Sequence, residues 1–215
     1  KQDTIYFYAL RDNEMTNLKV YDSQQGLFNF EDYRSQQSLI CVIKNTFSDI
    51  EIPDLATDVI KLSGSVQAFN FFDNTMNNLK GTGTILHLNH LEENKYFEFN
   101  ENTIKNNNGP AILLASGTEI ISMTISLNKV LHSSFSRTVF AISTVLHDGY
   151  ITFFGNLFVN NSLEIGDNDL NSKSSFIEMN SETSHKDAFL IFEKCIFVQN
   201  TYKNIRRFNQ YSQLN

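Results

Sequence analysis

The chain has 215 residues and a formal net charge of −7, with 41% hydrophobic and 13% aromatic residues. Its longest basic run is Arg206-Arg207, so the sequence lacks the basic footprint of a nucleic-acid-binding protein. No run of 18 apolar residues occurs, and the sequence therefore predicts no transmembrane helix.

The chain contains seven copies of a short sequence pattern. The first strand is predicted to begin by Ile5. Each copy is centred on an anchor residue, with apolar side chains five and three positions before it and two positions after it. Successive anchors are 26 to 39 residues apart, a spacing typical of solenoid proteins. The anchors are Asn13, Asn45, Asn74, Asn102, Asn128, Asn156 and Cys195.

The apolar positions form three columns, named here by their distance from the anchor. Column −5 contains Tyr8, Ile40, Phe69, Phe97, Met123, Ile151 and Leu190. Column −3 contains Leu10, Val42, Phe71, Phe99, Ile125, Phe153 and Phe192. Column +2 contains Met15, Phe47, Met76, Ile104, Val130, Phe158 and Phe197. All 21 residues are hydrophobic, so we expect the columns to line a continuous core.

The anchors themselves are predicted to lie at bends. Columns −5 and −3 share one face of a strand, because side chains alternate along it, whereas column +2 has the opposite parity. Asparagine tolerates the left-handed backbone conformation that a sharp bend needs. Stacked asparagine side chains can also bond one another from coil to coil. The pattern therefore predicts an asparagine ladder.

A second apolar run precedes each later anchor, and its centre lies 14 to 18 residues ahead. These runs occupy 27–30, 59–62, 85–88, 111–114, 139–142 and 176–179. We therefore expect each coil to consist of a strand, a turn, a strand, the asparagine bend, a short third strand and a variable loop. The predicted fold is all-β, a right-handed parallel β-helix of about seven coils. It forms a single domain over 1–215, with an insert loop at about 162–174.

Recurring F-x-x-N motifs carry a resemblance to known families. Three of them end at Asn74, Asn102 and Asn156, and two more cover Phe158–Asn161 and Phe197–Asn200. With the Gly109-Pro110-Ala111-Ile112 element, they resemble the repeats of chlamydial polymorphic outer-membrane proteins. The asparagine bend is similar to the ladder of pectate-lyase-like right-handed β-helices. The first resemblance implies an extracellular passenger or adhesin, and the second implies polysaccharide chemistry.

The two ends and the two cysteines give further expectations. Neither end shows a signal peptide or an amphipathic capping helix, so we expect a piece of a longer polypeptide whose ends contact more protein. Cys41 and Cys195 lie five coils apart, about 24 Å at ~4.8 Å per coil, and should both be free thiols.

One pair of carboxylates is a candidate catalytic site. Asp73 and Glu101 each precede an anchor on neighbouring coils, which places them on one face beside Lys44. A glycosidase could use such a pair as acid and nucleophile. The alternative is a solvated bend in which Lys44 relieves the repulsion. No third carboxylate or cluster of bases accompanies the pair, which favours the solvated bend.

The insert loop carries a weak calcium motif, and a sequon precedes it. Asp167, Asp169 and Asn171 have D-x-D-x-N spacing, and Glu178 stands at position twelve. Ser172 replaces the usual glycine at position six, no helices flank the motif, and Glu178 is expected to belong to a strand. Asn160 begins the single N-x-S/T sequon, Asn160-Asn161-Ser162, which predicts a glycosylation site or is a chance match.

The remaining reactive side chains predict no catalytic centre. His87 and His90 are expected on opposite sides of a strand, where they cannot easily share a metal. The other histidines are scattered, and neither cysteine has a nucleophile motif. The sequence therefore favours a non-enzymatic structural or adhesive segment of an extracellular or cell-surface protein, without cofactors. Its expected partners are other subunits, flanking coils or glycans. The alternative is a polysaccharide-active lyase or glycoside hydrolase.

Overall fold

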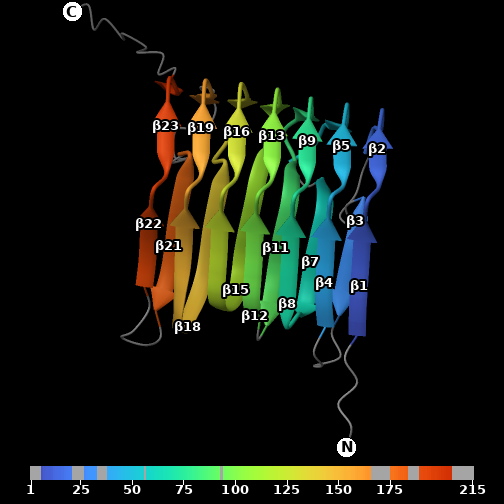
Figure 1. Cartoon of the computed structure of the whole chain (residues 1–215), viewed down its shortest axis with the longest axis vertical. Coiled ribbons are helices and arrows are strands. Elements are labelled where there is room, and N and C mark those ends of the chain that lie inside the picture. The colour runs from blue at the N-terminus through green and yellow to red at the C-terminus, as the bar shows by residue number, and fades with distance from the viewer. Residues whose placement is uncertain are drawn as a thin grey trace, which may run out of the picture.

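A computed structural model describes residues 6–20, 27–32, 38–55, 57–92, 94–165, 175–183 and 189–204. These residues form a parallel β-solenoid of three sheets with eleven, seven and six strands. Every paired strand runs parallel to its neighbours, as the stacked arrows of Figure 1 show. No helix occurs in the described part, and hence none that is long and apolar enough to cross a membrane.

One coil illustrates the path of the chain. It runs through β7 (Asp58–Ser65), β8 (Ala68–Phe72), β9 (Thr75–Asn77) and β10 (Lys80–Gly81). β7 and β8 belong to the eleven-stranded sheet, β9 to the seven-stranded sheet and β10 to the six-stranded sheet. The segment expected to be a variable loop therefore contains a fourth short strand, which stacks in its own sheet.

The other strands occupy equivalent places in their coils. In the eleven-stranded sheet they are β1 (Tyr6–Arg11), β3 (Phe28–Asp32), β4 (Ser38–Ile43), β11 (Thr84–Glu92), β12 (Asn94–Asn100), β15 (Ala111–Ser126), β18 (Phe140–Phe154), β21 (Ile177–Thr183) and β22 (Phe189–Glu193). The seven-stranded sheet adds β2 (Glu14–Thr16), β5 (Thr46–Ser48), β13 (Thr103–Lys105), β16 (Lys129–Leu131), β19 (Leu157–Val159) and β23 (Ile196–Val198). The six-stranded sheet adds β6 (Glu51–Ile52), β14 (Asn108–Gly109), β17 (Ser134–Phe135), β20 (Ser162–Ile165) and β24 (Thr201–Asn204).

Strand register confirms the three apolar columns. Column −3 stacks residue on residue, for example Val42 on Phe71 and Phe71 on Phe99, and columns −5 and +2 do the same. The rings of Phe71 and Phe99 stack with centroids 5.1 Å apart. In the interior coils these residues are fully buried, and the second apolar runs pair in register behind them. The columns therefore form the predicted continuous core.

The number of coils is smaller than predicted, because the solenoid has about five full turns rather than about seven. Seven repeats do contribute strands, and they form the seven-stranded sheet. Its outermost members, β2 and β23, each pair on one side only, and five strands lie between two neighbours. The two outer repeats therefore contribute strands without being enclosed. The expected insert loop also begins later, since Ser162–Ile165 form β20; residues 166–174 lie outside the described part.

The bends use a different residue from the one predicted. The left-handed conformation belongs to the residue before each anchor, with φ between 54° and 62°, and not to the asparagine itself. These residues are Asp12, Lys44, Asp73, Glu101, Leu127, Gly155 and Lys194. A second left-handed bend follows each third strand, at Asn17, Asp49, Asn78, Asn106, His132, Asn160 and Gln199. Each asparagine anchor is therefore free to turn its side chain along the stack.

Candidate functional site

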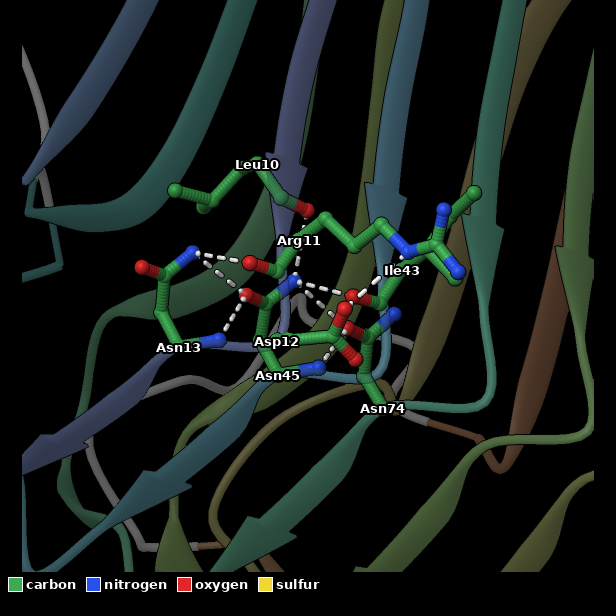
Figure 2. A network of polar contacts seen from close by, with 7 residues as sticks. All are labelled: Leu10, Arg11, Asp12, Asn13, Ile43, Asn45 and Asn74. Atoms are coloured by element: carbon green, nitrogen blue, oxygen red, sulfur yellow. Dashed lines mark hydrogen bonds and ion pairs between the residues drawn. The ribbon is translucent and has the colours of Figure 1, made fainter.

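The predicted asparagine ladder is present, and Figure 2 shows its first members. The Asn45 Oδ1 accepts hydrogen bonds from the backbone N–H and Nδ2 of Asn13, both at 3.0 Å. The Asn45 Nδ2 donates to the carbonyl of Leu10 and to Asn74 Oδ1. Each amide thus bonds the coil before it and the coil after it, which satisfies polar groups that the bend buries.

The same pattern continues through the interior. Asn102 Oδ1 accepts from the backbone N–H of Asn74 at 2.9 Å, and its Nδ2 donates to Asn128 Oδ1 at 3.0 Å. The ladder ends at Cys195, whose Sγ lies 3.7 Å from Asn156 Nδ2. The anchors from Asn45 to Asn156 are buried, so the ladder stabilises the stack from inside rather than presenting a binding surface.

A second ladder stands at the second bend and was not predicted. Backbone N–H groups donate to the side-chain oxygen of the next coil, from Leu79 to Asn107, from Asn107 to Ser133, from Ser133 to Asn161 and from Asn161 to Asn200. The second occurrence of F-x-x-N, ending at Asn161 and Asn200, was its signal in the sequence. Where the ladder meets apolar Leu79, the buried Asn107 Nδ2 has no partner among the described residues.

The outermost coils expose residues that the interior coils bury. In the last coil, Leu190, Phe192 and Phe197 continue the three columns and are 51%, 49% and 50% exposed. In the first coil Tyr8 is 42% exposed. The expectation of buried columns is therefore right for the interior and wrong at the two ends, because no described strand stacks beyond β22 and β23 or before β1 and β2.

The carboxylate pair lies where the sequence placed it. Asp73 and Glu101 occupy the first bends of neighbouring coils, and the Asp73 N–H donates to the Asn100 carbonyl at 3.2 Å. Both side chains are exposed, and neither makes a hydrogen bond or ion pair with another described residue. Lys44 occupies the same bend on the preceding coil. The pair thus shares an open surface, without the buried surroundings that tune catalytic carboxylates.

The calcium motif lies mostly outside the described residues, which omit Asp167, Asp169 and Asn171. Glu178 lies in β21, as expected, and its Oε2 accepts a hydrogen bond from the Thr138 hydroxyl at 3.1 Å. The sequon residue Asn160 is exposed at a second bend, and its Nδ2 lies 3.4 Å from His132 Nδ1. Within the described ranges, no three His, Cys, Asp or Glu side chains gather as metal ligands.

Both cysteines are free and partly buried, as predicted. Cys41 lies in β4, whereas Cys195 follows β22 at the end of the ladder. Burial raises the pKa of the Cys41 thiol above its ordinary value, and the Glu98 carboxylate acts in the same direction.

The raised pKa gives a test by alkylation. In a Cys195→Ser variant, the iodoacetamide reaction of Cys41 should reach half its limiting rate at a higher pH than that of a cysteine peptide. The reason is that the thiolate is the reactive form. Glu98→Gln should lower this midpoint slightly, and both thiols of the wild-type chain should react in denaturant. Coincident midpoints for Cys41 and the peptide would contradict the expectation.

His87 lies within hydrogen-bonding distance of two side chains, Asp58 and Ser116, that the sequence did not connect with it. His87 Nδ1 is 2.8 Å from Asp58 Oδ2, and His87 Nε2 is 3.3 Å from Ser116 Oγ. They come from β7, β11 and β15, which are consecutive strands of the eleven-stranded sheet. The side chains of His87 and Asp58 are 17% and 4% exposed, and Ser116 is partly exposed. His90 is exposed at a left-handed β-bulge, where simple strand alternation fails.

In comparisons with known proteins, no family model matches the chain, and neither a curated protein nor a solved structure matches it.

Proposed function

We propose that this chain is a structural and adhesive β-solenoid segment of an extracellular or cell-surface protein, where it is a rigid spacer and an assembly surface. The observation that carries the proposal is the exposure of the core columns at the last coil, by Leu190, Phe192 and Phe197. An exposed apolar face of this kind marks a contact with another polypeptide. Backbone groups at the edge of an uncovered strand also invite a further strand.

The occupant that fits this face is another parallel coil. The last coil presents the apolar residues of the three columns together with the unpaired edges of β22 and β23. Figure 1 shows these two strands at one end of the stack. The two ladders make the stack rigid, which suits a spacer. Exposed amides at the second bends, such as Asn106, also suit contact with glycans, and the exposed Asn160 suits glycan attachment.

Sedimentation of the 215-residue chain tests the proposal. At tens of micromolar, a working concentration for association, we expect self-association. A Phe192→Lys/Phe197→Lys variant should shift the chain toward monomer, because it places charge on the open face. The matched control is Ile191→Lys, on the other face of β22, which should leave the association unchanged.

Two outcomes would contradict the proposal. One is a cooperative wild-type monomer at this concentration. The other is the release of reducing sugar from acidic or neutral polysaccharides, abolished by Asp73→Asn, which would instead support the polysaccharide-active enzyme.

A further inference from the structure

We propose that Asp58, His87 and Ser116 form a nucleophilic triad that hydrolyses carboxylic esters on the outer face of the solenoid. This activity goes beyond the proposed structural role and does not depend on it. The two hydrogen bonds join an acidic, a basic and a nucleophilic group in the order Asp58–His87–Ser116. Such a triad is recognised by geometry and roles, and not by the order of its residues in a sequence.

Stacking of the coils explains how these residues meet. The register pairs His87 with Lys61 of β7 and with Leu114 of β15. Asp58 therefore lies three positions before the partner of His87 on one side, and Ser116 lies two positions after its partner on the other. The three side chains thus form a diagonal across three coils, and the imidazole ring of His87 bridges the Asp58 carboxylate and the Ser116 hydroxyl.

Solvent exposure increases along the triad, from the nearly buried Asp58 to the partly exposed Ser116. This order suits a positioning carboxylate at one end and a nucleophile that meets substrate at the other. The Asp58 carboxylate is almost fully buried and has His87 as its hydrogen-bond partner, which fixes the orientation of the ring. With Nδ1–H donating to the carboxylate, Nε2 of the neutral ring can accept the Ser116 proton. Its 3.3 Å distance to Ser116 Oγ is at the long end for a nucleophile and its base, which is usual without a bound substrate. The partly exposed Ser116 remains open to an ester from solvent.

A cation, Arg137, lies close enough to Asp58 for the two charges to interact. Burial lowers the pKa of Arg137 from its ordinary value, and the negative charge of Asp58 acts in the opposite direction. Arginine nevertheless stays protonated in proteins. Arg137 therefore places a positive charge near the carboxylate that accepts the hydrogen bond from His87 Nδ1–H.

The residue after Ser116 supplies a donor for the oxyanion. β15 pairs Ser116 with Ser143 and Thr118 with Thr144, so Gly117 forms a bulge with φ of 58°. A bulged residue is left out of the regular ladder, and we infer that the Gly117 N–H donates to the oxyanion. A Cβ at this position would lie 2.5 Å from His90 Nδ1, so a larger residue would have to displace the His90 ring.

The reaction balances with water as the second reactant. Ser116 Oγ forms a bond to the ester carbonyl carbon while its proton moves to His87 Nε2, and the carbonyl electron pair moves to the oxygen that faces the Gly117 N–H. Collapse breaks the bond to the alkoxy group, which takes the proton from Nε2 and leaves as the alcohol. Water then attacks the acyl-serine through the same proton transfers and releases the acid. Asp58 is a positioning residue throughout.

A fluorophosphonate probe tests the nucleophile directly on the 215-residue chain. We expect phosphonylation at Ser116, identified by peptide mass spectrometry, and turnover of p-nitrophenyl acetate. Ser116→Ala should abolish both. His87→Gln should slow labelling by at least ~10²-fold, the contribution of a general base. Asp58→Asn should slow it by as much as about 10⁴-fold, as when the aspartate of a serine triad becomes asparagine.

A matched control separates catalysis from folding. Ser143→Ala changes the serine that pairs with Ser116 on the next coil, and this variant should label at the wild-type rate. Thermal unfolding of every variant shows whether the solenoid is intact. The proposal is overturned if folded wild-type protein is not labelled at Ser116, or if a folded His87→Gln variant is labelled as fast as the wild type.

Discussion

Replacing Phe99 by alanine should lower the free energy of unfolding by about 3–5 kcal/mol, as other large truncations in a core do. The Phe99 side chain is fully buried in column −3. Its ring stacks on that of Phe71 with an interplanar angle of 2°. It also makes an edge-to-face contact with Phe140, with ring centroids 6.0 Å apart. Alanine leaves a cavity that the stacked strands on both sides cannot close. Urea unfolding followed by far-ultraviolet circular dichroism measures the loss.

Phe192→Ala is the matched control, because it removes the same side chain from the same column at the open end. Phe192 stacks on Phe153 at 4.7 Å but is 49% exposed, so its truncation should cost less than half as much as that of Phe99. Equal losses at low protein concentration would mean that the last coil is covered, and would contradict the open end. If the free energy of unfolding lost in Phe192→Ala grew with protein concentration, Phe192 would instead contribute to a contact between copies of the chain.

The second large effect is expected from the ladder. Asn102→Ala should cost about 2–4 kcal/mol, because buried groups left without partners cost about 1–3 kcal/mol each. The substitution removes the acceptor of the Asn74 N–H and the donor to the Phe71 carbonyl. Asn102→Asp should fail to rescue the loss, since a carboxylate keeps the acceptor but loses the donor and is charged in a buried site. The same unfolding measurement compares the variants.

Asn13→Ala is the control for the ladder, since Asn13 is exposed and stands at its first step. We expect it to cost under ~1 kcal/mol, because water can replace the lost contacts. If Asn13→Ala and Asn102→Ala destabilised the chain equally, the ladder would not act through the burial of its amides.

Periodicity made the core and the first ladder predictable. Each coil requires an apolar side chain at the same position, so Phe71, Phe99 and their equivalents recur at regular intervals in the sequence. The second ladder was harder to find, because its column changes from apolar Leu79 to Asn107 and Ser133 along the stack. The position of the left-handed residue was also hidden, since Lys44, Glu101 and Leu127 have no common turn preference.

The triad could not be predicted, for a different physical reason. Asp58, His87 and Ser116 occupy different positions within their repeats, so no column of the sequence contains them together. Their proximity depends on the register between β7, β11 and β15 and on the direction of each side chain. A single sequence contains neither quantity. His87 and His90 are near in sequence, whereas the two partners of His87 are 29 residues away on either side.

The anchor ladder also has a polarity. In each step a backbone N–H donates to the side-chain oxygen of the following coil, so these hydrogen bonds all run in the same direction. At one end Asn13 Oδ1 accepts no hydrogen bond from the described residues, whereas at the other end the column finishes with the thiol of Cys195. The two ends of the ladder are therefore chemically different. If one end stacks on the other, the contact is heterologous, and its repetition leads to unidirectional growth, as in a filament.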